Sequence, residues 1–116
     1  MKFLCLAYGR GDEWQALPRA EQEALLAQDE RLRQRGDLVA AVDTTSTVVR
    51  AWDGRPLTSE GPLASAQLPL AGFGLLEAEN LEHAVALVAD TPCARAGGAV
   101  ELRVITASND DERKAW

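Results

Sequence analysis

The sequence is poor in the side chains that most often carry out chemistry near neutral pH. It contains one histidine, His83, and two cysteines, Cys5 and Cys93. A structural zinc site normally needs about four Cys or His ligands at short local spacings, so we expect no metal site. The cysteines have no base nearby in the sequence, and His83 falls opposite the apolar stripe of a predicted helix. We therefore expect buried, unreactive thiols and a solvated histidine.

Long apolar runs and an excess of positive charge are also missing. No run approaches the ~20 residues that span a bilayer, and the apolar stretch 3–7 is too short for a signal peptide. We expect a cytoplasmic protein without a membrane partner.

Lys and Arg number 12 against 18 Asp and Glu, which gives a net charge of -6. That balance repels phosphate backbones, so we expect no nucleic-acid partner. Gly9-Arg10-Gly11 lacks the third glycine and the Lys-Ser/Thr of a nucleotide loop, and we expect no cofactor.

What the chain does contain is enough apolar material for one core, with 47% hydrophobic residues in 116. We expect a single domain over residues 1–106 and a C-terminal tail over 107–116. Residues 2–8 are apolar on both faces, which is typical of a central strand covered on both sides. Further strands are predicted at 38–42, 47–52, 71–77 and 99–106, with a hairpin arm at 55–59. Helices are predicted from Pro18 to Arg35 and from Asn80 until Pro92.

This order of elements predicts an α+β fold of the ferredoxin-like, split βαβ type. Both helices would lie on one face of an antiparallel sheet. Because the first strand is apolar on both faces, the second face also needs cover, and we expect a homodimer that packs sheet to sheet. The alternative is a lone domain with an open apolar face.

Two features suggest a binding groove. Gly72 and Gly74 leave one side of a strand without side chains, which often marks a close approach by a ligand or by backbone. Tyr8 or Trp52 could line such a groove from neighbouring strands. The alternative is tight packing of a helix on the sheet.

Glu60 stands apart from the other carboxylates, because it precedes Gly61-Pro62 in a loop beside apolar residues. A partly buried carboxylate there would have a raised pKa or pair with an arginine. It would act as a general acid or base, or it would form an ion pair that fixes the loop. Its candidate partners are Arg50, Arg95 and Arg103.

From residue 48 to 105 the chain reads as a strand, Asp53-Gly54, a Gly-Pro loop, a Gly-Phe strand, a helix and a closing strand. The loop tetrapeptide is Glu60-Gly61-Pro62-Leu63, and the closing pattern is Ala94-Arg95, Gly98, Val100-Glu101 and Arg103. This arrangement resembles the YCII-related family, in particular its DGPF subgroup of small bacterial proteins, whose tetrapeptide is Asp-Gly-Pro-Phe. The proline usually found after the arginine is missing.

The resemblance implies a dimeric α/β barrel with a cleft between sheet and helices. Some relatives carry a His and Asp pair for dehalogenation or lyase chemistry, but the first helix here has no histidine, so the pair is not carried over. We expect a protein of undefined activity, a non-catalytic homodimer that binds a small molecule or another protein. The alternatives are a lyase or monooxygenase-like enzyme and an accessory partner of a sigma factor. Glu60 is the candidate catalytic residue. The predicted binding residues are Tyr8, Trp52, Glu60, Gly61, Pro62, Gly72, Gly74, Arg95 and Arg103.

Overall fold

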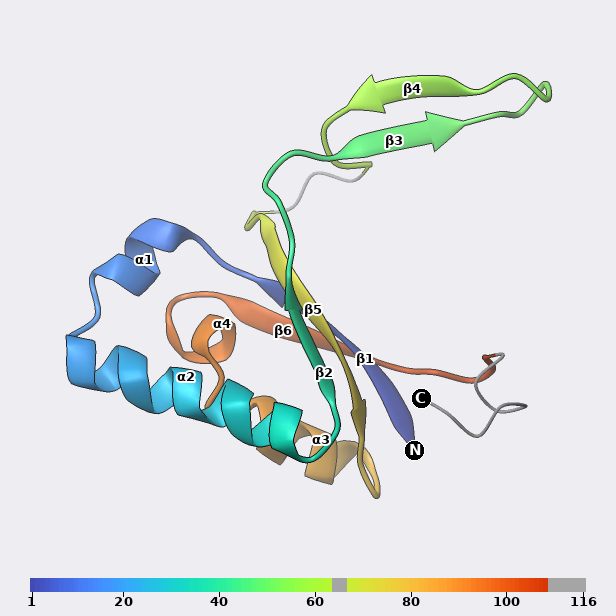
Figure 1. Ribbon diagram of the computed structural model, residues 1–116. Coiled ribbons are helices and arrows are strands. Elements are labelled where there is room, and N and C mark those ends of the chain that lie inside the picture. Colours follow the sequence, from blue (N-terminus) through green and yellow to red (C-terminus); the bar gives the residue numbers. More distant parts are fainter. Residues whose placement is uncertain (64–66, 109–116) are drawn as a thin grey trace.

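A four-stranded antiparallel sheet forms the centre of the molecule, with strand order β2-β5-β1-β6 (Figure 1). The computed structural model describes residues 1–63 and 67–108. Residues 64–66 and the part of the predicted tail from 109 onward lie outside the described residues. The strands are β1 (Lys2–Tyr8), β2 (Leu38–Ala41), β5 (Leu70–Glu77) and β6 (Ala99–Val104). The predicted α+β class is therefore confirmed, with the first strand at the centre of the sheet.

The helices lie on one face of this sheet (Figure 1). The main ones are α2 (Arg19–Gln34) and α3 (Leu81–Val88), and two short ones are α1 (Gly11–Gln15) and α4 (Pro92–Arg95). The segment of α2 is rich in good helix formers, and Gly36 beyond its end takes a φ of 99°. Asn80 caps α3 by accepting the backbone N–H of His83 at 2.8 Å.

Three local details differ from the sequence-based expectation. Helix α3 ends at Val88, and Pro92 instead begins α4, where its missing N–H costs nothing. The ordered loop expected after β1 contains the short helix α1. His83 is half-buried rather than solvated, and its Nδ1 accepts the N–H of Glu79 at 3.0 Å.

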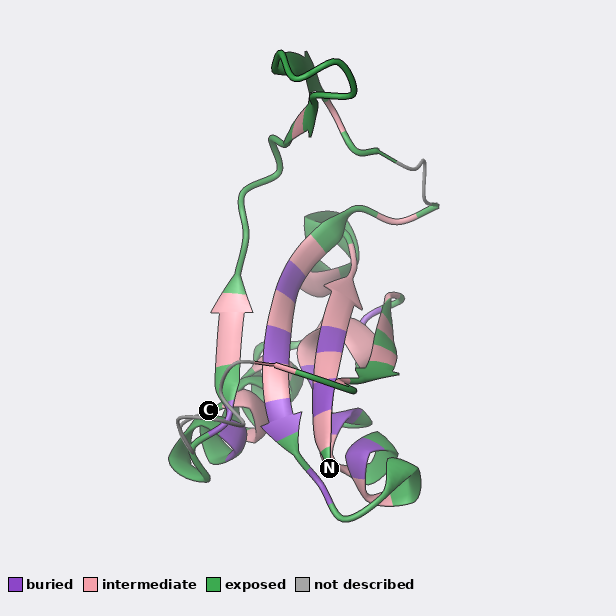
Figure 2. Ribbon diagram, turned by 90° about the vertical axis from the view of Figure 1, so that its right-hand side faces the viewer, coloured by how far each residue is buried: buried purple, intermediate pink, exposed green. Residues whose placement is uncertain are grey.

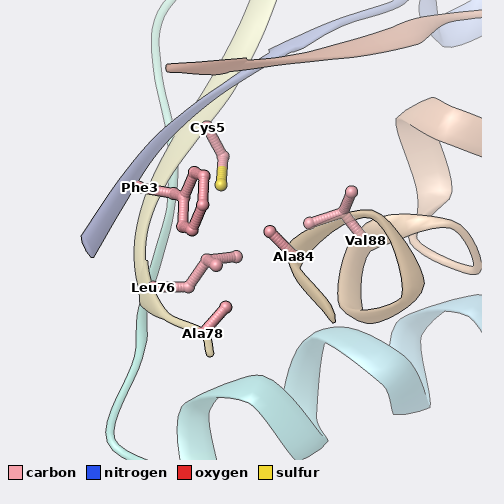
Figure 3. Packing of buried hydrophobic residues seen from close by; sticks show 6 residues of the cluster. All are labelled: Phe3, Cys5, Leu76, Ala78, Ala84 and Val88. Carbon is pink, nitrogen blue, oxygen red and sulfur yellow. The ribbon is translucent and has the colours of Figure 1, made fainter. Parts of the chain in front are cut away.

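The core lies between the sheet and the helices (Figure 3). Phe3 and Cys5 of β1 and Leu76 of β5 face Ala84 and Val88 of α3. These strand residues share one face because side chains alternate along a strand, and the register pairs Phe3 with Leu76. The rest of the predicted α3 stripe is exposed, Leu81 at 56% and Val85 at 50%.

The opposite side of the sheet, here called the open face, is covered by none of the helices of the described chain (Figure 2). The register places Leu4 and Leu6 of β1 there, beside Leu75 and Phe73 of β5. All four are half-buried. The strand β1 is thus apolar on both sides, as expected, but only one side is filled by the protein's own helices.

Strands β3 (Thr47–Arg50) and β4 (Leu57–Glu60) form a separate two-stranded sheet. We call this hairpin, residues 47–60, the arm. Asp53-Gly54 lies in its turn, with Gly54 at a φ of 87°. The arm projects beyond the end of the main sheet (Figure 1). The radius of gyration is 16.1 Å, whereas a compact domain of this length is expected near 13 Å.

Candidate functional site

A cleft of about 190 Å³ opens between the main sheet and helices α2 and α4. Its walls are mostly apolar, and a few polar side chains interrupt them. The wall residues used below come from β1, α2, β5, α3 and α4 and from the turn between α2 and β2. They are Cys5, Asp29, Leu32, Arg33, Asp37, Gly72, Gly74, Val88 and Cys93.

The floor of the cleft includes Gly72 and Gly74 of β5. A Cβ atom on Gly72 would overlap the carbonyl oxygen of Ala40, and one on Gly74 would lie 2.8 Å from the carbonyl oxygen of Leu38. Both carbonyls belong to β2, the neighbouring strand. The glycines are therefore required by the close approach of the β2 backbone, rather than by the packing of a helix. Because they have no side chains, they leave space in the cleft above them.

Asp29 is the polar group of the cleft whose environment is most unusual. It lies on α2, half-buried, one turn before Arg33. Burial raises the pKa of its carboxyl group, and the positive charge of Arg33 opposes that rise. Arg33 is about half exposed and its Nη1 lies 3.5 Å from Glu30 Oε2. A carboxyl group with a raised pKa beside a cation is an arrangement suited to proton transfer.

Two thiols also line the cleft, and neither forms a disulfide. Burial raises the pKa of Cys5 to about 11, with a further contribution from the negative charge of Asp37. Burial likewise raises the pKa of Cys93, and the negative charge of Asp29 adds to it. Both thiols are protonated at neutral pH and are poor nucleophiles.

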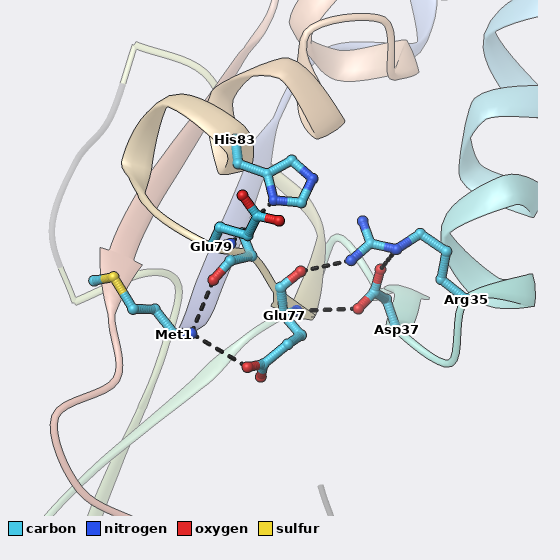
Figure 4. Close-up of polar contacts among 7 residues, drawn as sticks. Met1, Arg35, Asp37, Glu77, Glu79 and His83 are labelled. Atoms are coloured by element: carbon cyan, nitrogen blue, oxygen red, sulfur yellow. Dashed lines mark hydrogen bonds and ion pairs between the residues drawn. The ribbon is translucent and has the colours of Figure 1, made fainter.

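Asp37, although it lines the cleft, belongs to a polar cluster at the end of β5 (Figure 4). Its Oδ1 accepts the N–H of Glu77 at 3.1 Å, and its Oδ2 lies 3.6 Å from Arg35 Nε. Arg35 also donates to the carbonyl of Glu77 at 2.6 Å. The amino group of Met1 donates to Glu77 Oε1 at 3.2 Å. We interpret Asp37 as a structural carboxylate that ties the end of α2 to β5.

The structure does not bring the predicted site residues together. Trp52, Glu60, Gly61 and Pro62 all lie on or next to the arm. Trp52 is 91% exposed, and Glu60 is exposed opposite Thr47. The expectations that Trp52 lines the glycine groove and that Glu60 is partly buried beside an arginine are therefore wrong. The physical reason is that β3 and β4 pair with each other instead of joining the main sheet.

The remaining predicted residues are divided between three other places. Gly72 and Gly74 line the cleft. Tyr8 and Arg103 have the strand parity of the open face, where Arg103 pairs with Glu101 at 2.9 Å. Arg95 of α4 pairs with Asp90 at 2.8 Å. The described ion pairs of Arg95 and Arg103 are thus with other carboxylates, not with Glu60 as predicted.

Sequence reasoning missed Asp29, Arg33 and Cys93 as members of one site. Asp29 and Arg33 have the i, i+4 spacing of a surface ion pair, which is typical of a solvated helix face. The signal that could have separated them is Leu32, which is buried beside them at 3% exposure. It places that side of α2 toward the sheet.

Replacing Gly72 by alanine should damage the floor of the cleft. The new Cβ would overlap the carbonyl oxygen of Ala40, so β2 and β5 must separate. We expect a loss of about 1–3 kcal/mol in the free energy of unfolding, measured by urea denaturation. Gly11→Ala is the matched control, because nothing lies within 4 Å of a Cβ there. Equal stability of the two variants would contradict this account of the floor.

The charge of Asp29 can be read out at the neighbouring thiol. In Asp29→Asn the pKa of Cys93 should fall, because the negative charge that helps to raise it is removed. Alkylation of Cys93 by iodoacetamide at pH 8 should become faster, as followed by mass spectrometry of the peptide. Cys5, whose pKa is about 11, is the internal control. An unchanged Cys93 rate would place the two side chains too far apart to interact.

Comparison with known proteins now identifies the family. A model of the YCII-related domain matches residues 1–108. The chain belongs to the YCII-related family. The match confirms the family resemblance drawn from the motifs of the sequence. Comparison with proteins of curated function gives no match for this YCII-related chain.

A solved structure aligns with nearly all of this YCII-related chain. It is the 5-chloro-2-hydroxyhydroquinone dehydrochlorinase TftG from Burkholderia phenoliruptrix AC1100, in complex with 2,5-dihydroxybenzoquinone. The alignment covers 94% of this chain and 97% of that chain, with 19% identity and a TM-score of 0.49. The aligned protein is an enzyme, and this contradicts the prediction of a non-catalytic binding protein. That prediction is withdrawn together with the sigma-factor alternative, and the likeness assigns no substrate to the YCII-related chain.

Two further properties concern the described part of this YCII-related chain. None of its helices is both long and apolar enough to cross a membrane. Its His, Cys, Asp and Glu side chains form no group of three or more that could hold a metal ion.

Proposed function

We propose that this protein is an enzyme that moves a proton on a small, largely apolar ring compound held in the cleft. Asp29 is the group that takes up and returns the proton. The observation that carries the proposal is a half-buried carboxyl group with a raised pKa in the wall of an otherwise mainly apolar cleft. Buried carboxyl groups of this kind are frequent at sites of general acid–base catalysis.

The size of the cleft supports a substrate of one ring. Its volume is about 190 Å³, and a cavity of roughly 150 Å³ is sufficient to bind benzene. Leu32, Val88 and the glycine floor offer apolar contact to both faces of a flat molecule. Apolar walls also exclude water, which strengthens the electrostatic interactions between the substrate and the few charged groups.

Arg33 would stabilise the charge that develops during the reaction. When the Asp29 carboxylate removes a proton from a carbon beside a carbonyl, the electrons of the broken C–H bond move to the carbonyl oxygen. The guanidinium of Arg33, one helical turn away and on the same wall, can hold that oxygen anion. In a substrate with a C=C bond next to that carbon, return of the proton from Asp29 to the far end of the dienolate completes an isomerisation. In a substrate with a leaving group on the next carbon, the electrons re-form the C=O bond, a C=C bond forms and the group departs with its bonding pair, which completes an elimination.

The proposal is tested with cyclohexanone as the probe. NMR in D₂O follows exchange of the protons beside its carbonyl, with and without the protein. We expect faster exchange, with a rate that rises with pH and levels off above the raised pKa of Asp29, because the carboxylate is the active base. Ring-ketone exchange that is no faster than in buffer, together with no shift of the resonances of the cleft, would contradict the proposal.

We also propose that the protein is a homodimer joined through the open face. Support comes from the half-buried Leu4, Leu6, Phe73 and Leu75, which form a continuous apolar surface on the central strands. Such a surface commonly marks a protein interface.

The net charge of -6 disfavours a nucleic-acid partner. The two unbonded thiols suit a reducing compartment such as the cytoplasm.

A further inference from the structure

We propose that the arm, residues 47–60, packs against a second copy of this chain and helps to hold the dimer together. This inference does not depend on the proton-transfer chemistry, and it rests on the homodimer proposed above. Exposed apolar side chains lie on both strands of the hairpin and on both of its faces. Val49 is 61% exposed and Leu57 is 69% exposed, while Trp52 near the turn is 91% exposed. Large apolar groups at such exposure are typical of a surface that is covered by a partner.

The arm has too little structure of its own to stand alone in water. It consists of two strands of four residues each, and every residue of β4 is exposed. An isolated two-stranded hairpin is marginally stable at best, and it normally needs a third strand or a packed face. The arm pairs with no strand of the main sheet. Contact with another molecule would supply the missing face.

The direction of the arm points to the side on which a second copy would sit. In Figure 1 the helices lie to the left of the main sheet, and the arm extends to the right above it. Figure 2 views the molecule from that right-hand side, and the arm stands above the open face. The arm and the open face therefore lie on the same side of the molecule, away from the helices. A second copy packed on the open face would contact the arm of the first copy. The arm of the second copy would contact the first copy in the same way.

Charge favours the arm as the part that meets another copy. The chain carries a net charge of -6, so two copies repel each other as a whole. The arm contains Arg50 and Arg55 against Asp53 and Glu60, and it is neutral. It can therefore approach an acidic copy without adding repulsion. The Arg50 guanidinium lies 6.0 Å from the centroid of the Trp52 ring, which helps to hold the indole in a fixed orientation.

The first test uses Trp52 as a reporter. In the variant Trp14→Phe, Trp116→Phe, Trp52 is the only remaining tryptophan. Sedimentation equilibrium and fluorescence are measured over the same concentration series. As dimer forms, we expect the emission of Trp52 to shift to shorter wavelength and its quenching by acrylamide to fall. A chain that stays monomeric to hundreds of micromolar would overturn the proposal. A dimer in which Trp52 remains as accessible as in the monomer would overturn it equally.

The second test compares two leucines of similar exposure. Leu57 lies in the arm, and Leu81, 56% exposed, lies on α3 on the other side of the sheet. Leu57→Ser should raise the dissociation constant of the dimer at least about tenfold, because each dimer loses two buried side chains. Leu81→Ser should leave it unchanged. Equal effects of the two substitutions would show that the arm has no special part in association.

Discussion

Replacing Asp29 by asparagine should lower the rate of cyclohexanone exchange by about 10²–10⁴, the usual contribution of a general acid or base. Asparagine keeps the shape of the side chain and cannot take up a proton. Glu23→Gln is the matched control, because Glu23 lies on the same helix but is exposed and paired with Arg19 at 3.3 Å. That variant should retain the full rate. A rate in Asp29→Asn within a factor of three of the original would remove Asp29 from the mechanism.

Stability separates this loss of rate from a loss of structure. Burial raises the pKa of Asp29 above the ordinary aspartate value of 3.8. The stability linked to its protonated form is present below that value and is lost as the pH rises through the raised pKa. At pH 7 the ionised carboxylate therefore lowers the free energy of unfolding. We expect Asp29→Asn to be at least as stable as the original protein at pH 7, with the advantage fading toward pH 3, as followed by thermal denaturation.

Replacing Phe73 by aspartate should convert the proposed dimer into a monomer. Phe73 lies on the open face opposite Leu6, and a charge in the centre of an apolar interface would have to lose its water without gaining a partner. We expect the dissociation constant to rise by at least about a hundredfold, corresponding to roughly 3 kcal/mol. Sedimentation equilibrium at micromolar concentration gives the measurement.

The control for this prediction is Val85→Asp. Val85 is 50% exposed on α3, away from the open face, so a charge there should not alter association. Phe73→Asp and Leu57→Ser also separate the two interface proposals. If only the first substitution weakens the dimer, the open face is the interface and the arm is not part of it. If neither does, the homodimer proposal fails as well.

Local patterns in the sequence were sufficient to predict most of the main sheet and both long helices. The run of apolar residues in β1, the helix formers that end at Gly36 and the cap at Asn80 each act over a few residues, so they can be recognised without the fold. The short helices α1 and α4 were missed because each is about a single turn, too short to show a helical repeat of apolar residues. Pro92 was interpreted as the end of one helix, although it is equally suited to begin the next.

The site was predicted poorly because it depends on contacts between distant segments. Gly72 and Gly74 were recognised from their spacing, but the reason for them is the carbonyl groups of β2, more than thirty residues earlier. Asp29 looks like any other acid of a charged helix until α4 is placed beside it. Glu60 has a suggestive neighbourhood in the sequence, yet β4 pairs only with β3, and this leaves Glu60 in solvent. Which hairpin joins a sheet is decided by tertiary structure, which no local motif reports.

The glycine floor has a consequence for how the cleft could change over evolutionary time. A side chain cannot be introduced at Gly72 or Gly74 without displacing a neighbouring strand, so mutation cannot reshape the floor of the cleft at these two positions. New preferences for size, polarity or handedness of the bound compound must instead arise from the other lining residues, on the neighbouring strands and on the helices that face them. Descendants of this protein would keep the two glycines of the floor and vary in the other residues that line the cleft.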